Sequence, residues 1–255
     1  MPFTFAHPAA VLPFKYLPKR CTSLTGLVIG SMAPDFEKFL SMEGGNSYSH
    51  TWGAIFWFCL PLGIMLSFVF HLVVRDPLID NLPGFMRRRV ARFKKLDWKV
   101  HFTEHYFIII TSIIIGATTH IIWDGFTHKN GPGENQLALL GEHTSLSVFS
   151  VPLFYFLNLL SSAIGVVVVL YAIMRLPAEP VVAEKSKRTK AYWPLVVFLM
   201  LAIVGIRFSA GLNLEEVMGV KGDFWNLIIA IVAASLISLL IAPIFLKLLF
   251  FNRGS

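Results

Sequence analysis

The sequence predicts an all-α membrane protein, a polytopic bundle of about five transmembrane helices preceded by a short N-terminal buried or re-entrant helix. Of the 255 residues, 55% are hydrophobic and only 15% are charged, whereas soluble domains contain about 25% charged residues. The mean hydropathy is +0.67. This composition excludes a soluble globule and a disordered chain. The net charge of +7 does not indicate a nucleic-acid partner, because basic residues of membrane proteins mostly record orientation.

Five apolar runs are long enough, or nearly so, to cross the hydrocarbon core as helices, which takes about 20 residues. Two of the five are short. We expect the first of these to extend back toward Trp98, and Arg207 to snorkel from the end of the other. The expected spans cover residues 53–74, 106–123, 145–174, 191–206 and 224–246.

The chain before the first span contains an apolar stretch, residues 21–34, that is too short to cross a membrane. We expect a buried or re-entrant helix here. Pro34 suits the first turn of a helix and so predicts a second short helix over 35–41. We interpret the whole chain as one membrane domain, 1–255, made of an outer N-terminal segment (1–52), the first two spans (53–128) and three further spans (145–255).

The basic residues predict an orientation, because cytoplasmic connections of membrane proteins are enriched in Lys and Arg. Fifteen of the 22 basic residues lie in segments 75–99, 175–190 and 247–255. We therefore expect an outer N-terminus and a cytoplasmic C-terminus in a bacterial inner membrane. The basic stretch 87–95 either marks topology alone or also binds anionic lipid headgroups. The opening residues lack the pattern of a signal peptide, and Cys21 and Cys59 do not indicate a disulfide framework.

Histidine and aspartate gather on the side predicted to face outward. His120 and Asp124 are four residues apart and therefore share one helix face. His128 follows on that face if the helix continues past Gly125. An imidazole and a carboxylate at this spacing can bind one divalent metal ion. Three further candidate ligands precede them on the same predicted side: His7, Asp35 and His50.

Each of these residues also has a structural interpretation. His120 and Asp124 would suit a hydrogen-bonded pair that closes a helix at the membrane interface. Asp35 would suit a first-turn acid favoured by the helix dipole, and His50 an interfacial residue ahead of a span. His143 is interpreted as a loop residue.

Four segments are distinctive: residues 1–14 (MPFTFAHPAAVLPF), 23–40 (SLTGLVIGSMAPDFEKFL), 49–53 (SHTWG) and 116–131 (GATTHIIWDGFTHKNG). With them, the chain resembles an uncharacterised bacterial family of short multi-pass membrane proteins, known as a domain of unknown function. The resemblance is close over roughly the first 145 residues. It implies the architecture but no activity.

The order of the polar motifs is also remotely similar to that in inner-membrane proteins described as metal-dependent hydrolases and in zinc-dependent phospholipase C. The N-terminal tryptophan and the later His-x-x-x-Glu pair of the phospholipase are absent here. The similarity therefore implies one or two divalent ions, with zinc favoured, rather than three. By motif order its ligands would be His7, Asp35, His50, His120, Asp124 and His128.

Three functions follow as hypotheses. The first is a membrane-embedded metal-dependent hydrolase acting at the outer bilayer face on a lipid-derived phosphoester, with Asp124 and His128 as catalytic candidates. The second is a non-catalytic scaffold in which a metal or a polar network holds the N-terminal segment onto the spans. The third is a transporter, suggested by polar residues in later spans. These residues are Asn158, Ser161, Ser162 and Arg207.

The expected partners are membrane lipids, with no nucleic acid, and the oligomeric state is not predicted.

Overall fold

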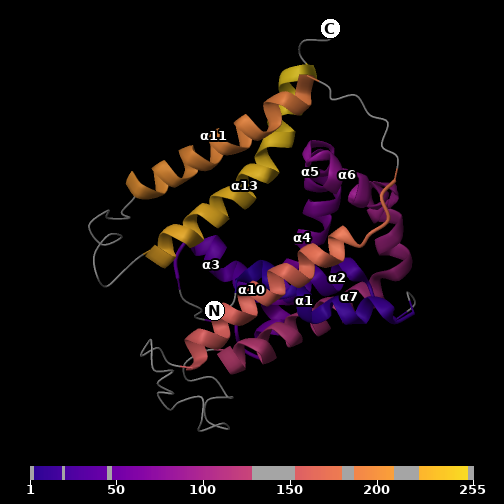
Figure 1. The fold of residues 1–255 in the computed structure, drawn as a ribbon, viewed down its shortest axis with the longest axis vertical. Helices are drawn as coiled ribbons and strands as arrows, with labels where there is room; N and C mark the ends of the chain where they lie inside the picture. Colours follow the sequence, from indigo (N-terminus) through magenta and orange to yellow (C-terminus); the bar gives the residue numbers. More distant parts are fainter. Residues whose placement is uncertain are drawn as a thin grey trace. The chain divides into compact units, whose positions relative to one another are not determined.

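The computed structural model describes residues 3–18, 21–44, 48–127, 153–179, 187–209 and 224–251 (Figure 1). Among these residues all regular secondary structure is helical, which confirms the predicted fold class. Five helical segments of the described chain are long and apolar enough to cross a membrane, so the protein is a multi-pass membrane protein. They are Ile55–Asn81, Trp98–Phe126, Phe156–Met174, Lys190–Ser209 and Trp225–Leu249.

The first span is longer than the sequence suggested. It was expected to end at residue 74, but α4 (Leu60–Val69) continues through a π-helical turn, Phe70–Val74, into α5 (Arg75–Asn81). In that turn the Arg75 N–H bonds to the Phe70 carbonyl, five residues back. A wider turn at this point accommodates Pro77, which cannot donate a hydrogen bond.

Other helix ends also differ from expectation. The connection expected over 75–99 is partly helical, because it contains α5, α6 (Gly84–Val90) and a 3₁₀ turn, Ala91–Lys95. The second span does reach back to Trp98, as α7 (Trp98–Thr127), with non-helical dihedral angles at His105. The helix expected over 35–41 begins one residue later, as α3 (Phe36–Ser41), because the preceding residues form a 3₁₀ turn, Ala33–Asp35.

The chain forms two compact units. Unit 1 comprises Met1–Asp35, Ser47–Ser67 and Lys99–Arg175, and includes α1 (Pro8–Val11), α2 (Leu24–Met32), most of α7 and α10 (Leu153–Met174). Unit 2 comprises Phe36–Asn46, Phe68–Trp98 and Leu176–Ser255, and includes α3, α5, α6, α11 (Lys187–Ser209) and α13 (Phe224–Phe251). All candidate ligands within the described residues belong to unit 1.

In unit 1, small residues bring α2 against α7. A Cβ atom added to Gly26 would lie 2.8 Å from the Ile109 carbonyl oxygen and 2.8 Å from the Ser112 Cβ. Gly30 and Gly116 are just as tightly enclosed at this contact. Small residues four apart are a common means of close helix packing in membranes. The expected short helix over 21–34 is therefore α2, largely buried against α7.

Ser23 fixes the position of α2 along α7. As the N-cap of α2, its hydroxyl accepts a hydrogen bond from the Gly26 N–H, and its own N–H donates to the Ser112 Oγ at 2.8 Å. The same register carries the end of α2, with Ser31, toward the last turns of α7.

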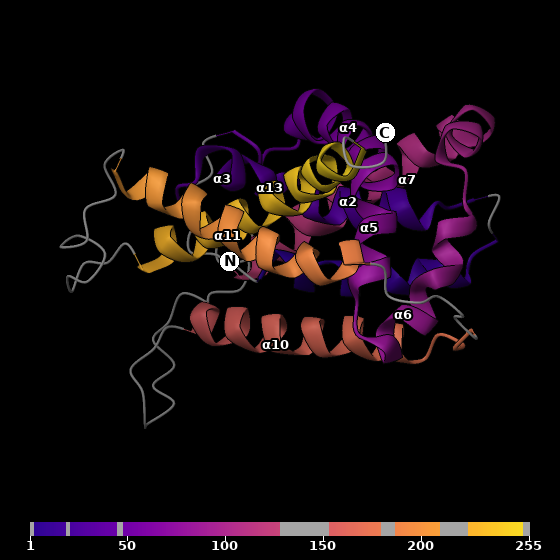
Figure 2. The same ribbon diagram turned by 90° about the horizontal axis from the view of Figure 1, so that it is seen from above.

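The N-terminal turns of unit 1 pack against α10, a long helix that is straight in Figure 2. The Phe3 N–H donates to the Ser162 Oγ at 2.8 Å, and the Gly165 Cα faces Ala6 so closely that a Cβ would lie 2.6 Å from the Ala6 Cβ. These contacts hold the segment that carries His7 inside the unit.

In unit 2, α11 and α13 run antiparallel and side by side (Figure 1). Their contact buries Tyr192 and Val196 of α11 against Ala242 and Leu246 of α13.

Candidate metal centre

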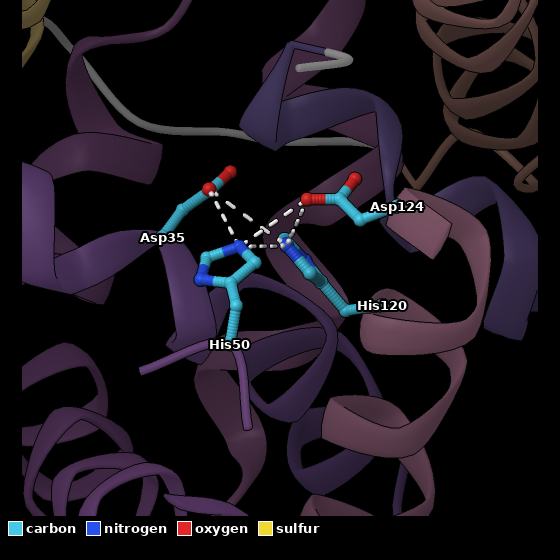
Figure 3. A group of neighbouring side chains, drawn as sticks. All are labelled: Asp35, His50, His120 and Asp124. Carbon is cyan, nitrogen blue, oxygen red and sulfur yellow. Dashed lines mark hydrogen bonds and ion pairs between the residues drawn. The ribbon is translucent and has the colours of Figure 1, made fainter. Parts of the chain in front are cut away.

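Four polar side chains from three parts of unit 1 converge on one point, as Figure 3 shows. Asp35 ends the 3₁₀ turn that follows α2. His50 lies just before the first span. His120 and Asp124 occupy the last two turns of α7, on one face.

Five of the six distances between the four potential ligand atoms lie between 3.2 and 3.7 Å. The His50 Nε2 lies 3.2 Å from the His120 Nε2, 3.2 Å from the Asp124 Oδ2 and 3.6 Å from the Asp35 Oδ1. The His120 Nε2 lies 3.7 Å from the Asp35 Oδ1 and 3.4 Å from the Asp124 Oδ2. Around a tetrahedral ion with bonds of about 2.0–2.1 Å, ligand atoms lie about 3.3–3.4 Å apart. Five of the six pairs are thus close to the spacing of a tetrahedral metal site, and all four atoms lie within 4.8 Å of one another.

A second layer of hydrogen bonds orients three of these side chains. The His120 Nδ1 lies 2.7 Å from the Ser31 carbonyl oxygen. A carbonyl only accepts, so Nδ1 carries a proton, and in the neutral ring Nε2 presents its lone pair to the centre of the group. The Thr4 hydroxyl donates to the Asp35 Oδ2 at 2.6 Å, and the His50 Nδ1 lies 2.8 Å from the Ser49 Oγ. Such partners are typical of metal-binding histidines and carboxylates.

Burial and charge also suit a cation. Asp35 and Asp124 are 1% and 5% exposed, so two carboxylates lie inside the protein within reach of each other. Unpaired buried charges are costly, and a divalent cation would neutralise both. Protonation of His50 and His120 is the other way to balance them. Asp35, His50, His120 and Asp124 could therefore hold a metal ion.

His7 lies beside this group rather than within it. Its Nε2 is 3.6 Å from the Asp124 Oδ1, the oxygen that does not face His50, and its ring stacks on the His120 ring with centroids 3.7 Å apart. His7 is 4% exposed. The structure thus brings five of the six sequence candidates together. The sixth, His128, lies outside the described residues, as does His143.

Three contributors were not singled out from the sequence: Thr4, Ser31 and Ser49. Ser31 acts through its main-chain carbonyl, which leaves no side-chain signal in the sequence. Thr4 reaches Asp35 across 31 positions of the chain, a pairing that no local pattern indicates. Only Ser49 had a signal, since it directly precedes His50 in the Ser-His motif.

The chain belongs to the family described as a domain of unknown function (DUF4184), whose family model matches residues 1–244. The match extends well past the first 145 residues on which the resemblance was strongest. Searches of the curated proteins and of the solved structures found no significant match.

Proposed function

We propose that this protein is a membrane-embedded metal-dependent hydrolase in which Asp35, His50, His120 and Asp124 hold one zinc ion. The observation that carries the proposal is the convergence of the four ligand atoms, which all lie within 4.8 Å of one another inside the protein. The donors are imidazole nitrogens and carboxylate oxygens, which suit zinc and other first-row divalent metals.

In such a site the ion supplies a Lewis acid and lowers the pKa of a bound water to about 7. His50, whose side chain is 16% exposed, marks the side from which water and substrate would enter. Asp124 directs one oxygen to the ligand group and the other toward His7. The His7 Nε2 is thus placed to accept or return a proton beside the reacting group. His128 stays a catalytic candidate from the sequence.

The location supports a lipid-derived phosphoester as substrate. His120 and Asp124 lie at one end of a span, the depth at which lipid headgroups meet the hydrocarbon. The remote similarity of the ligand order to zinc-dependent phospholipase C points the same way. The sequence-predicted orientation would place this site at the outer face of a bacterial inner membrane.

One observation favours a structural metal instead. Four protein ligands fill a tetrahedral site, whereas catalytic zinc keeps a position open or expands to five ligands. A structural ion would fasten the N-terminal segment, through Asp35 and His50, to the end of α7. Two of the four residues that suggested transport have structural partners: Ser162 accepts from the Phe3 N–H, and Arg207 pairs with Glu43 at 2.6 Å.

The first test is the metal content of the purified protein by elemental mass spectrometry. We expect about one divalent ion per chain, lost in His120→Ala and in Asp124→Ala. The matched controls, His105→Ala from the same helix and Asp97→Ala from an exposed site, should retain it. A folded wild-type protein that stays metal-free after supply of zinc, manganese and iron would contradict the proposal.

The second test separates hydrolysis from a structural role. The metal-loaded protein is assayed on a panel of phospholipids and soluble phosphodiesters, with and without chelator. A hydrolase should turn over at least one phosphoester, and chelation and His120→Ala should both abolish that turnover. A chelator that lowers the melting temperature of a protein inactive on the whole panel would establish the structural role.

A further inference from the structure

Unit 2 contains a pocket of about 510 Å³ where the ends of three candidate spans meet. Its lining includes Asp76 and Asn81 at the end of the first span, Tyr192 at the start of the fourth and Lys247 at the end of the fifth. In a chain that crosses five times, these three ends fall on the same face of the membrane. The pocket therefore lies at headgroup depth, on the face that the basic residues predict to be cytoplasmic.

Two buried polar atoms that belong to pocket-lining residues have no hydrogen-bond partner within the described part of the chain. They are the Tyr192 Oη and the Asn81 Oδ1, and Tyr192 as a whole is 1% exposed. The orientation of Asn81 is fixed, because its Nδ2 donates to the Pro77 carbonyl at 2.8 Å. Buried polar groups without partners are rare and costly. A ligand that donates to Asn81 and accepts from Tyr192 would satisfy both.

The charged residues around the pocket indicate which ligand groups it can bind. Asp76 pairs with Arg75 at 2.6 Å, and Asp80 pairs with Lys94 at 2.6 Å, so these acidic residues are already neutralised on one side. Lys247 has no ion-pair partner among the residues that the structure describes. The Lys247 ammonium, which lines the pocket, favours a phosphate group. The half-exposed side chains of Asp76 and Asp80, which also line the pocket, favour a cation.

We propose that this pocket binds a phospholipid with a primary ammonium in its headgroup, such as phosphatidylethanolamine. Lys247 and the Tyr192 hydroxyl bind the phosphate, and Asn81 and Asp76 accept hydrogen bonds from the ammonium. The acyl chains lie along the apolar part of the lining, which includes Leu72 and Ile244. The site uses no residue of the metal centre and does not depend on the proposed hydrolysis.

The test compares three probes by native mass spectrometry of the full chain in detergent. Phosphatidylcholine of equal chain length keeps the phosphate but has no N–H donor, and glycerophosphoethanolamine keeps the headgroup but has no acyl chains. We expect phosphatidylethanolamine to bind about tenfold more tightly than phosphatidylcholine. Glycerophosphoethanolamine should not bind at concentrations that saturate the lipid site.

Two variants test the residues. Tyr192→Phe should weaken binding of phosphatidylethanolamine by about three- to tenfold, the effect of one lost hydrogen bond. Tyr171→Phe, the same change on the exposed surface of α10, should have no effect. Lys247→Gln, at an exposed position, should weaken both phospholipids alike because it removes the phosphate contact.

Three outcomes would overturn the proposal: equal affinity for the two phospholipids, binding of glycerophosphoethanolamine as tight as that of the lipid, or unchanged affinity in both Tyr192→Phe and Lys247→Gln. Melting temperatures of the variants exclude misfolding as the cause of a loss. A soluble phosphoester would be the ligand in the second case.

Discussion

Two buried histidines, His120 in unit 1 and His71 in unit 2, show how differently the same side chain is used in this protein. They are 1% and 7% exposed, and both lie in candidate spans. The His120 Nδ1 donates to a carbonyl, which leaves Nε2 facing Asp35 and Asp124. The His71 Nδ1 lies 3.0 Å from the Arg75 Nη1 and must accept, because a guanidinium only donates. The Nδ1 atoms of the two rings therefore have opposite roles, donor in His120 and acceptor in His71.

The surroundings of His71 exclude a metal ligand. Its ring stacks on Trp98 at 4.2 Å between centroids, and Arg75 also donates to the Leu96 carbonyl at 2.8 Å. A permanent guanidinium charge beside the imidazole repels any cation, while it ties the first span to the chain that precedes α7. Burial alone does not distinguish a ligand from a structural histidine. The partner of the second ring nitrogen and the sign of the neighbouring charge do.

The largest expected effect concerns the carboxylate charge that distinguishes the surroundings of His120 from those of His71. Asp35→Ala should abolish metal binding, because it removes one ligand and half of the carboxylate charge at the site. His71→Ala should leave the metal content unchanged and lower the free energy of unfolding by about 1–3 kcal/mol, since Arg75 loses a buried acceptor. Elemental mass spectrometry and thermal melts in detergent measure the two effects. Loss of metal in His71→Ala would refute the distinction between the two histidines.

A second prediction concerns the helix contact that positions the Ser31 carbonyl for His120. A Cβ at Gly116 would meet the Leu27 carbonyl oxygen and lie 2.6 Å from the Ser31 nitrogen. Gly116→Ala should therefore push α2 away from α7, destabilise the protein by about 3 kcal/mol and reduce the bound metal.

Gly205 of α11 is the matched control, because a Cβ there meets no atom within 4 Å. Gly205→Ala should stabilise its helix by up to about 1 kcal/mol. Thermal melts of both variants check the pair. Equal stabilities would show that α2 does not depend on close packing against α7.

The smallest expected effect tests the hydrogen bond that orients Asp35. Thr4→Val keeps the shape of the side chain but removes the hydroxyl that donates to the Asp35 Oδ2. Loss of such a second-layer partner should weaken metal binding by about 10- to 100-fold, measured by competition with a chelator of known affinity. Thr111→Val is the control. The Thr111 hydroxyl donates to carbonyls of its own helix, so its removal should have no effect on metal binding. Unchanged affinity in Thr4→Val would mean that the hydrogen bond does not position the carboxylate.

Much of the fold was predictable, because it depends on local properties. The length of each apolar run and the absence of charge within it predict the five spans, and the four-residue spacing of His120 and Asp124 predicts their common face. Helix ends were less predictable. The helices within 75–99 are polar and basic, so hydropathy gives no sign of them. The apolar run ends at residue 74, where a π-helical turn lets the helix continue.

The sequence by itself determined that this protein is a helical membrane protein with its histidines and aspartates gathered near span ends, because hydropathy and periodicity act over one or two helical turns. Only the tertiary structure decided that Asp35, His50, His120 and Asp124 share one point. The His50 and His120 nitrogens that meet are separated by 70 positions, and Ser31 and His120 by 89. Contacts at such separations depend on glycines that let α2 approach α7 and on which atom each imidazole presents. Neither property is visible in a single stretch of sequence.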